Sequence, residues 1–477
     1  MSIRQLEPTA LWSAFADLNA VPRPSKQEER VRAFVRGFGE SLGLETLEDE
    51  VGNILIRKPA TPGREDRPTV LLQGHVDMVH QKNAGTDFDF ATEGIRMLQD
   101  GDWVKAEGTT LGADNGIGVA AIMAVLADEG TIAHPPIEAL FTVDEETGMT
   151  GAKGLQPGFL SARYMLNLDT EDDRELTIGC AGGIDVTATG DCSMEDFPAG
   201  RVGVRVTVRG LSGGHSGMQI HEGLGNANKL LTRLLLSLDS ANLARFDGGG
   251  LRNAIPREAF ADLAVADFEA TAEVLEQAGA PIISEYSITD PLLEIVVEPR
   301  DVPQQVLRPR DQRQLLRALQ ACPNGIYRMS PAVAGLVQTS NNLARVLIAD
   351  GAYQVLCLTR SSVDSEKHDQ VAAIRSVFEL IGGEVSLDGD YPGWTPLPES
   401  TLLTTMRDLY REEFGEEPHV NACHAGLECG LIGEKVPGME MISFGPNITG
   451  AHSPDEQVQI SSVQKFWGYF VKTLSRL

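Results

Sequence analysis

Basic residues are scarce in this chain relative to acidic ones. Its 477 residues include 40 Lys and Arg against 68 Asp and Glu, which gives a formal net charge of −28 at pH 7. Such an excess of negative charge repels nucleic-acid phosphates and anionic membrane surfaces, so neither is expected as a partner. The remaining composition, with 42% hydrophobic and 23% charged residues, is typical of a soluble globular protein.

Cysteine, leader sequences and long apolar runs are also sparse or missing. The six cysteines are scattered singly, which favours reduced thiols over a disulfide framework. The first residues, MSIRQLEPTALW, lack the basic-then-apolar pattern of a secretory signal. No run approaches the ~18 apolar residues that a membrane-spanning helix needs. We therefore expect a cytoplasmic protein without membrane association.

The two ends of the chain carry the pattern of an α/β domain. The length exceeds one ordinary core and predicts at least two domains. Ser25 and Glu28 match a capping box before an early helix. Strand-like runs then alternate with helical patterns, and the runs lie at 52–58, 69–75, 137–143 and 163–169. This alternation predicts an α/β catalytic domain whose central, mostly parallel sheet is flanked by helices.

The middle of the chain has a different pattern. From residue 197 the segment RVGVRVTVRG alternates apolar and polar residues, as a half-exposed strand does. Two sets of strands and helices follow, and α/β character returns near residue 392. We therefore predict a discontinuous domain of residues 1–196 and 388–477, with an inserted α+β domain of residues 197–387 built from two similar halves.

Acidic and imidazole groups follow several of the predicted strands. The apolar run in ALFTVDEETG ends in Asp144, Glu145 and Glu146, and burying like charges together is unfavourable without a positive partner. Similar groups follow the other strands, namely His75 with Asp77, Asp169 and His452, and Asp114 precedes a helix. In α/β sheets, ligands bind beyond the carboxyl ends of strands. Imidazoles and carboxylates without a thiol suit Zn²⁺, Mn²⁺ or Co²⁺, so we expect a pair of divalent cations there.

The local spacings suggest separate roles. In His75-Val76-Asp77 the outer side chains share one side of an extended segment, so Asp77 can orient the imidazole. On an extended chain Glu145 and Glu146 point in opposite directions, so one can bind metal while the other accepts a proton from water. Asp114 has the alternative role of a helix N-cap, or it can bridge two cations.

Long motifs in this chain resemble a known enzyme family. The segments GHVDMV, GTTLGADNGIG, DEETGM, NLDTED, GGHSG, LRNAIP and GAHSPDE are similar to those of the co-catalytic di-zinc peptidases, which include aminoacylase, carboxypeptidase G and bacterial dipeptidases. VGNILIRKPAT, GCAGGID, HEGLGNANKLL and HAGLECGL resemble the aminoacyl-histidine dipeptidase branch. The likeness runs from about residue 10 to the C-terminus and is weakest at 265–350.

The resemblance implies roles for the residues at the strand ends. One zinc would be held by His75, Asp114 and Asp169. The other would be held by Asp114, Glu146 and His452. Glu145 would be the general base, and Asp77 the residue that orients His75. The family fold is a catalytic domain with an inserted lid domain, which agrees with the predicted organisation.

The inserted domain and the C-terminal part carry further candidates. The resemblance implies that His215 steadies the oxyanion and that Asn253 binds substrate. Arg360 is the best match for a clamp on the substrate carboxylate, and its alternative role is that of a surface arginine. His424 and Glu428 are expected near the substrate, with Glu428 on its amine.

The implied function is metal-dependent hydrolysis of dipeptides, including Xaa-His dipeptides such as β-alanyl-histidine, by a homodimer. Within the family, an N-acyl amino acid amidohydrolase or a tripeptidase is the alternative. A two-metal phosphoesterase and a non-catalytic metal-binding protein are alternatives of other classes. The absence of a P-loop argues against the former, and the complete ligand set with Glu145 argues against the latter.

Overall fold

The computed structural model describes residues 2–301 and 304–477, and the chain divides into two compact units. The first unit is Met1–Gly179, Pro396–Ala422 and Leu427–Leu477, and the second is Cys180–Thr395 and Cys423–Gly426. The crossings between these compact units lie at 179/180 and 395/396, whereas the sequence analysis predicts domain boundaries at 196/197 and 387/388. A short segment near residue 424 also belongs to the second unit.

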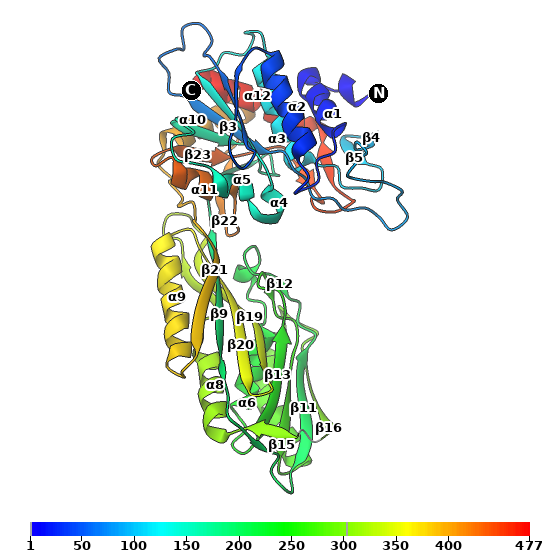
Figure 1. Ribbon diagram of the computed structural model, residues 1–477, viewed down its shortest axis with the longest axis vertical. Coiled ribbons are helices and arrows are strands. Elements are labelled where there is room, and N and C mark those ends of the chain that lie inside the picture. The colour runs from blue at the N-terminus through cyan, green and yellow to red at the C-terminus, as the bar shows by residue number, and fades with distance from the viewer. Residues whose placement is uncertain (1, 302–303) are drawn as a thin grey trace. The chain divides into compact units, whose positions relative to one another are not determined.

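A mixed sheet forms the centre of the first unit (Figure 1). Its strands, in spatial order, are β1 (Glu45–Glu48), β2 (Ile54–Lys58), β6 (Ile137–Thr142), β3 (Val70–His75), β7 (Tyr164–Asn167), β23 (Glu440–Ser443), β8 (Glu175–Cys180) and β22 (His419–Cys423). The neighbouring strands β6, β3, β7 and β23 pair in parallel, whereas β1 with β2, β2 with β6 and β23 with β8 pair antiparallel. Strands β3 and β6 are buried along their whole length, which explains their unbroken apolar runs.

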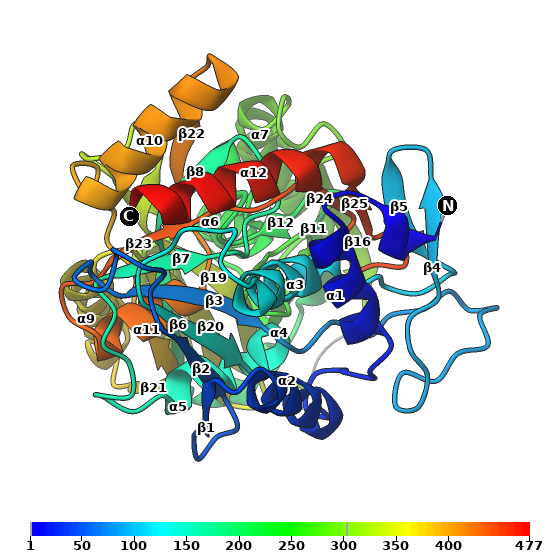
Figure 2. The same ribbon diagram turned by 90° about the horizontal axis from the view of Figure 1, so that it is seen from above.

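Helices cover this sheet. They are α1 (Thr9–Asn19), α2 (Glu29–Ser41), α3 (Ala113–Ala127), α10 (Thr401–Phe414), α11 (Glu428–Lys435) and α12 (Ile460–Arg476), with short helices α4 (Glu145–Gly148) and α5 (Thr150–Gly154). Helix α3 packs on β3 and lies beside α1 (Figure 2). It is buried on every side, so an Ala-rich apolar sequence suits it.

A small second sheet lies in the same unit. Its strands are β24 (Ile448–Thr449), β25 (Gln457–Gln459), β5 (Trp103–Ala106) and β4 (Met97–Asp100). The loop between the paired strands β24 and β25 carries His452, whose φ is 65°. Pairing of β25 with β5 therefore ties this loop to a distant part of the sequence.

The second unit is built on one large antiparallel sheet (Figure 1). Its strands, in spatial order, are β16 (Glu294–Arg300), β11 (Val202–Arg209), β15 (Ala259–Val265), β13 (Asn242–Gly249), β19 (Val337–Ala349), β20 (Ala352–Ser361), β9 (Gly182–Asp191) and β21 (Glu384–Tyr391), with β18 (Gly325–Met329) paired to β19. The two predicted halves join where β13 pairs with β19. Strand β9 pairs with β20 and β21, which is why the crossing precedes it.

Four helices pack on this sheet. They are α6 (Ala227–Leu235), α7 (Phe268–Glu285), α8 (Pro309–Ala321) and α9 (Asp364–Glu379). The alternation predicted for β11 is confirmed, because Val204, Val206 and Val208 are buried in the core that these helices share. Among the described residues, no helix combines the length and apolarity needed to cross a membrane.

Candidate metal centre and substrate-binding residues

The five candidate metal ligands, all in the first unit, come together in space. His75 ends β3, Glu146 lies on α4 just after β6, and Asp169 follows β7. Asp114 lies at the start of α3, and His452 lies in the loop between β24 and β25. Because β3, β6 and β7 are adjacent and parallel, their carboxyl ends meet at one edge of the sheet.

Two groups of three ligands share Asp114. His75 Nε2 lies 3.1 Å from Asp114 Oδ1 and 3.5 Å from Asp169 Oδ1. His452 Nε2 lies 3.3 Å from Asp114 Oδ2 and 3.1 Å from Glu146 Oε2. In each group, one ligand atom per residue lies within 4.8 Å of the others. Each Asp114 oxygen thus faces a different imidazole, and this carboxylate is the one that the two groups share.

The electrostatics of the cluster suit bound cations. Glu146 Oε1 and Asp169 Oδ1 are buried and accept no hydrogen bond from the described residues. Burial raises the pKa of Asp169, and hydrogen bonding to Asp114 and Glu146 raises the pKa of His452 to about 11. Uncompensated buried carboxylates are costly, and a divalent cation removes that cost. The residues present therefore fit a pair of divalent cations with nitrogen and oxygen ligands.

Asp77 links the first imidazole to the neighbouring loop. His75 Nδ1 faces this residue, 3.2 Å from its backbone oxygen and 3.4 Å from Oδ1. The Asp77 carboxylate also accepts the backbone N–H groups of Glu145, at 3.0 Å, and Glu146, at 3.3 Å. The ring of His75 therefore presents Nδ1 to Asp77 and Nε2 to Asp114 and Asp169. The same carboxylate fixes the first turn of α4.

Ser25 differs from its predicted role. The N-cap residue of α2 is Glu28, and no side chain caps the helix, so the predicted capping box is wrong. The Ser25 hydroxyl instead donates to Asp77 Oδ2 at 2.8 Å. The Ser25 hydroxyl therefore forms a tertiary hydrogen bond with a residue 52 positions away instead of capping the helix that its local sequence predicts.

Glu145 and Glu146 lie on a helical turn rather than on extended chain, so the predicted backbone is wrong here. The turn follows Asp144, whose φ is 51° and whose carboxylate accepts hydrogen bonds from Thr147 and Thr150. Glu145 nevertheless lies beside the metal cluster, within ligand distance of His75 and Glu146. Burial raises the pKa of Glu145 well above its ordinary value. The site therefore favours uptake of a proton by this carboxylate.

Two buried residues that the sequence analysis missed hold the Asp114 loop. The Glu456 carboxylate accepts four successive backbone N–H groups, those of residues 111–114, at 2.7, 2.9, 2.7 and 3.1 Å. Arg23 donates to the backbone oxygens of Val76, at 3.2 Å, and Gly112, at 2.5 Å. Burial lowers the pKa of Arg23 to about 10. A signal for Glu456 was available, because it ends the motif GAHSPDE.

Replacing Glu456 by Gln should destabilise the first unit. The Gln amide nitrogen would face backbone N–H donors, which should lower the free energy of unfolding by about 2–3 kcal/mol. Urea unfolding of metal-free and metal-loaded protein measures this. The exposed neighbour variant Asp455→Asn is the control and should change stability by less than about 0.5 kcal/mol. Equal stability of the two variants would contradict the role given to Glu456.

Glu428 is buried in the first unit at the start of α11. Its Oε2 accepts hydrogen bonds from Gln73 Nε2, at 2.7 Å, and Thr142 Oγ1, at 2.6 Å. Its Oε1 is buried and accepts no hydrogen bond from the described residues. Burial raises the pKa of Glu428 to about 7. One carboxylate oxygen is thus held in place while the other is left for a ligand.

The other four candidates lie in the second unit. His215 is in β12 (Gly214–His215), which pairs with β14 (Ala254–Ile255) directly after Asn253. The backbone oxygen of Asn253 accepts the N–H of Ser216 at 2.8 Å, and Asn253 is itself exposed. A Cβ atom added at Gly217 would meet the His215 ring, Arg360 Nε and the His424 carbonyl. These three residues therefore lie close together. Asn253 is near His215 because β14, which directly follows Asn253, pairs with β12.

The two histidines of this group are fixed as neutral imidazoles. His215 Nδ1 accepts the backbone N–H groups of Gly217, at 3.2 Å, and Met218, at 3.1 Å, so Nε2 carries the proton. His424 Nε2 lies 2.8 Å from Ser340 Oγ. Burial lowers the pKa of His215, and that of His424 to about 3, and the positive charge of Arg360 adds to both effects. His215 can therefore donate from Nε2 to an oxyanion.

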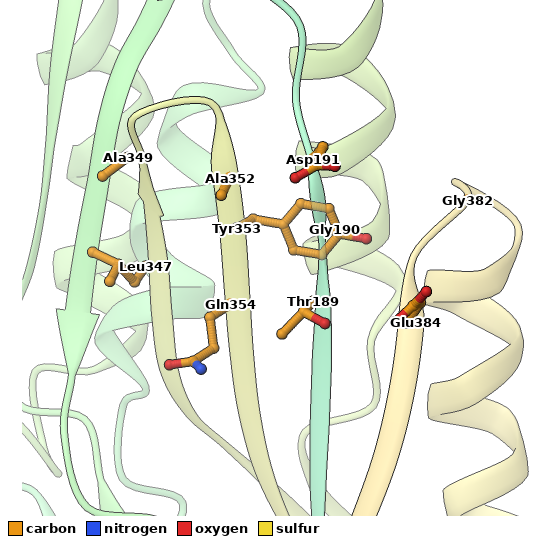
Figure 3. A pocket seen from close by; sticks show the side chains of 10 residues that line it. All are labelled: Thr189, Gly190, Asp191, Leu347, Ala349, Ala352, Tyr353, Gln354, Gly382 and Glu384. Atoms are coloured by element: carbon orange, nitrogen blue, oxygen red, sulfur yellow. The ribbon is translucent and has the colours of Figure 1, made fainter.

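A separate hollow of about 520 Å³ lies in the second unit (Figure 3). Its lining residues are Thr189, Gly190, Asp191, Leu347, Ala349, Ala352, Tyr353, Gln354, Gly382 and Glu384. They come from β9, β19, β20 and β21, except for Gly382, which lies in the connection between α9 and β21. None of the twelve candidate site residues is among them, so the candidate chemistry does not reside in this hollow.

Known proteins share both the sequence and the fold. The model of peptidase family M20/M25/M40 matches residues 71–476. The cytosol non-specific dipeptidase of Escherichia coli (strain K12) is 44% identical over 481 residues, covering 100% of this chain and 99% of that protein. The crystal structure of aminoacylhistidine dipeptidase from Vibrio alginolyticus is 44% identical, with a TM-score of 0.95 over 99% of this chain and 98% of its own.

A more distant structure, aminopeptidase PepT from Bacillus cereus, shares the fold at 17% identity, with a TM-score of 0.58 and 99% coverage of both chains. The likeness to the two 44% relatives extends over essentially the whole chain. The family match covers most of the chain, including all five candidate metal ligands. This protein therefore belongs to peptidase family M20/M25/M40.

Proposed function

We propose that this protein is a dinuclear metallo-dipeptidase that hydrolyses dipeptides, including Xaa-His dipeptides such as β-alanyl-histidine. The observation that carries the proposal is Asp114, whose two carboxylate oxygens face the imidazoles of His75 and His452. Support also comes from the 44% identity to dipeptidases from Escherichia coli and Vibrio alginolyticus. By the same likeness we propose a cytoplasmic location.

The proposed metal ligands are divided between two cations. His75, Asp114 and Asp169 would hold one, and Asp114, Glu146 and His452 the other. Zn²⁺ is the preferred ion for this donor set, and Co²⁺ and Mn²⁺ are compatible with it. When bound, such a pair supplies Lewis-acid activation of water and of the scissile carbonyl.

Proton transfer is assigned to Glu145. Its buried carboxylate lies beside the cluster, and its raised pKa favours taking a proton from the attacking water. The same group then gives the proton to the leaving amine. Asp77 fixes the backbone of Glu145 while it orients His75, so it positions base and ligand together.

Substrate recognition and oxyanion stabilisation are assigned to the remaining candidates. The Nε2–H of His215 would donate to the tetrahedral oxyanion. Arg360 would bind the substrate α-carboxylate, and Asn253 and His424 would line the same subsite. Glu428 Oε1, buried and without a partner among the described residues, would accept the substrate ammonium group. Of these residues, Glu428 belongs to the first unit, and His215, Asn253, Arg360 and His424 belong to the second.

The first unit is proposed as the catalytic domain and the second as the lid and dimerisation domain. Support for the first assignment comes from the five candidate metal ligands, which all lie in the first unit. We propose a homodimer as the active form, and sedimentation velocity at enzyme-assay concentrations measures its mass.

A substrate panel tests the proposed function. Dipeptides with and without a C-terminal histidine, β-alanyl-histidine, a tripeptide, an N-acetyl amino acid and a phosphate ester are assayed on chelated protein re-supplied with Zn²⁺, Co²⁺ or Mn²⁺. We expect dipeptide hydrolysis that chelation abolishes and added metal restores. Xaa-His dipeptides should be among the hydrolysed substrates.

Other outcomes of the panel favour the alternatives. Cleavage of the N-acetyl amino acid or the tripeptide, with dipeptides inert, would indicate an amidohydrolase or a tripeptidase. Hydrolysis of the phosphate ester alone would indicate a phosphoesterase. Metal binding without turnover of any substrate would indicate a non-catalytic metal-binding protein.

A further inference from the structure

Arg360 is a buried cation that forms no ion pair with the described residues, although the Asp185 carboxylate on β9 lies near enough for the charge of Arg360 to act on it. Only 5% of the Arg360 surface is exposed, and no carboxylate of the described residues lies within ion-pair distance. Its Nε is buried and makes no hydrogen bond with the described residues. A buried guanidinium in this condition is costly unless an anion binds to it. The neighbouring side chains of His215 and His424 are imidazoles, which carry no negative charge and so cannot act as that anion.

The Tyr391 side chain contacts the Arg360 guanidinium across strand β9. Strand β9 lies between β20 and β21 (Figure 1). Arg360 on β20 is opposite Gly183 on β9, and Gly183 is opposite Tyr391 on β21. Arg360 Nη1 donates a hydrogen bond to the Tyr391 hydroxyl at 3.2 Å. Nη1 of the guanidinium is thus held by a phenol, while Nε, which is buried close to Gly217, has no hydrogen-bond partner among the described residues.

The absence of a side chain at Gly183 allows the contact between Tyr391 and Arg360. A Cβ atom at this position would lie 2.6 Å from the Tyr391 hydroxyl oxygen and 2.7 Å from two of its ring carbons. Such distances are below normal van der Waals contact, so any side chain at Gly183 would displace the ring. The glycine therefore opens a gap in β9 through which residues of the two outer strands touch.

The backbone of Tyr391 is also held firmly. Its carbonyl oxygen accepts a hydrogen bond at 2.6 Å from Lys367 Nζ, and Lys367 is only 1% exposed. The same ammonium group pairs with Asp390 at 2.7 Å. Burial raises the pKa of Tyr391, so the phenol stays protonated at neutral pH. A fixed, uncharged hydroxyl can hold a guanidinium without neutralising it, which a carboxylate could not do.

We propose that Tyr391, placed by Gly183, is a positioning residue that orients Arg360 toward the substrate α-carboxylate and so makes a free C-terminus a requirement for tight binding. This inference rests on the proposed dipeptidase function. It separates two roles within one subsite, because Arg360 supplies the charge while Tyr391 fixes its direction. The effect of Tyr391 should therefore depend on whether the substrate carries a carboxylate.

The test compares Tyr391→Phe with the wild type on a dipeptide and on the same dipeptide with a C-terminal amide. Loss of a hydrogen bond to a charged group should raise KM for the free dipeptide about tenfold. The kcat should stay within about twofold, because the phenol does not touch the reacting atoms. The amide should have a high KM with both proteins and show no further change in the variant.

Matched variants control for folding. Tyr353→Phe removes a buried hydroxyl of the same unit that has no hydrogen-bond partner among the described residues, and its KM should equal that of the wild type. Gly183→Ala displaces the Tyr391 ring without removing the phenol and should raise KM for the free dipeptide as Tyr391→Phe does. In an Arg360→Ala background, Tyr391→Phe should cause no further change in KM. Thermal unfolding confirms that each variant is folded.

Three outcomes would overturn this inference while the proposed function stands. They are an unchanged KM of Tyr391→Phe, an equal rise of KM for dipeptide and amide, and a wild-type enzyme that does not distinguish the two substrates. A wild-type protein that hydrolyses no dipeptide with any metal would instead refute the proposed function.

Discussion

Replacing Glu145 by Gln should lower kcat roughly a thousandfold, the scale of a lost general base. The variant keeps the size and shape of the side chain but cannot accept a proton from water. Because Glu145 is proposed as a base and not as a ligand, its metal content should equal that of the wild type. Steady-state kinetics with saturating metal, together with metal analysis of the dialysed protein, measures both quantities.

Glu146→Gln is the informative comparison, because the two glutamates are adjacent and both lie within ligand distance of His75. Since Glu146 Oε2 faces His452 at 3.1 Å, this variant should lose metal as well as activity. The exposed Glu129→Gln should match the wild type in both measurements. If Glu145→Gln lost metal while Glu146→Gln kept it, the two proposed roles would have to be exchanged.

Replacing Asp114 by Ala should remove both metals and lower kcat/KM by at least about 10³-fold. Lewis-acid activation contributes several kcal/mol, and each 1.36 kcal/mol is a factor of ten in rate. Both oxygens of Asp114 face a candidate ligand histidine, so the substitution removes a ligand from both groups at once. Calorimetric titration of the chelated variant with Zn²⁺ measures the loss of affinity for the metal.

The exposed Asp87→Asn is the control for the loss of one acidic residue and should bind metal as the wild type does. His452→Ala gives a graded result, because His452 belongs to only one of the two groups. This variant should lower the affinity for one of the two cations and leave the other cation bound. An Asp114→Ala protein that binds two cations with wild-type affinity would contradict the bridging role.

Most of the strand-end cluster could be predicted because its members follow buried strands. The runs before His75, Glu145 and Asp169 are apolar enough to require a sheet interior. Parallel pairing of adjacent strands then brings their carboxyl ends together, whatever the rest of the chain does. The backbone after β6 could not be predicted in the same way, since a helical turn there depends on Asp77 accepting two N–H groups.

Other parts of the site depend on partners that are remote in sequence. Apart from its place in the motif GAHSPDE, nothing in the local sequence distinguishes Glu456 from other acidic residues. Its role depends on hydrogen bonds from backbone N–H groups at and before Asp114, about 340 positions away. Arg23 lies in a loop whose sequence gives no sign that its guanidinium will be buried. Ser25 followed the capping-box pattern yet bonds to Asp77. In each case a tertiary hydrogen bond overrode or created the role.

The sequence by itself determined the fold class and pointed to the candidate nitrogen and oxygen ligands, because apolar periodicity and strand-end chemistry are local properties of the chain. The tertiary structure alone decided where the units divide, which oxygen of Asp114 faces which imidazole, and that Tyr391 reaches Arg360 across Gly183. These features arise from strand register and long-range packing. Strand register and long-range packing bring together residues that are far apart in the sequence, and the local sequence does not predict such contacts.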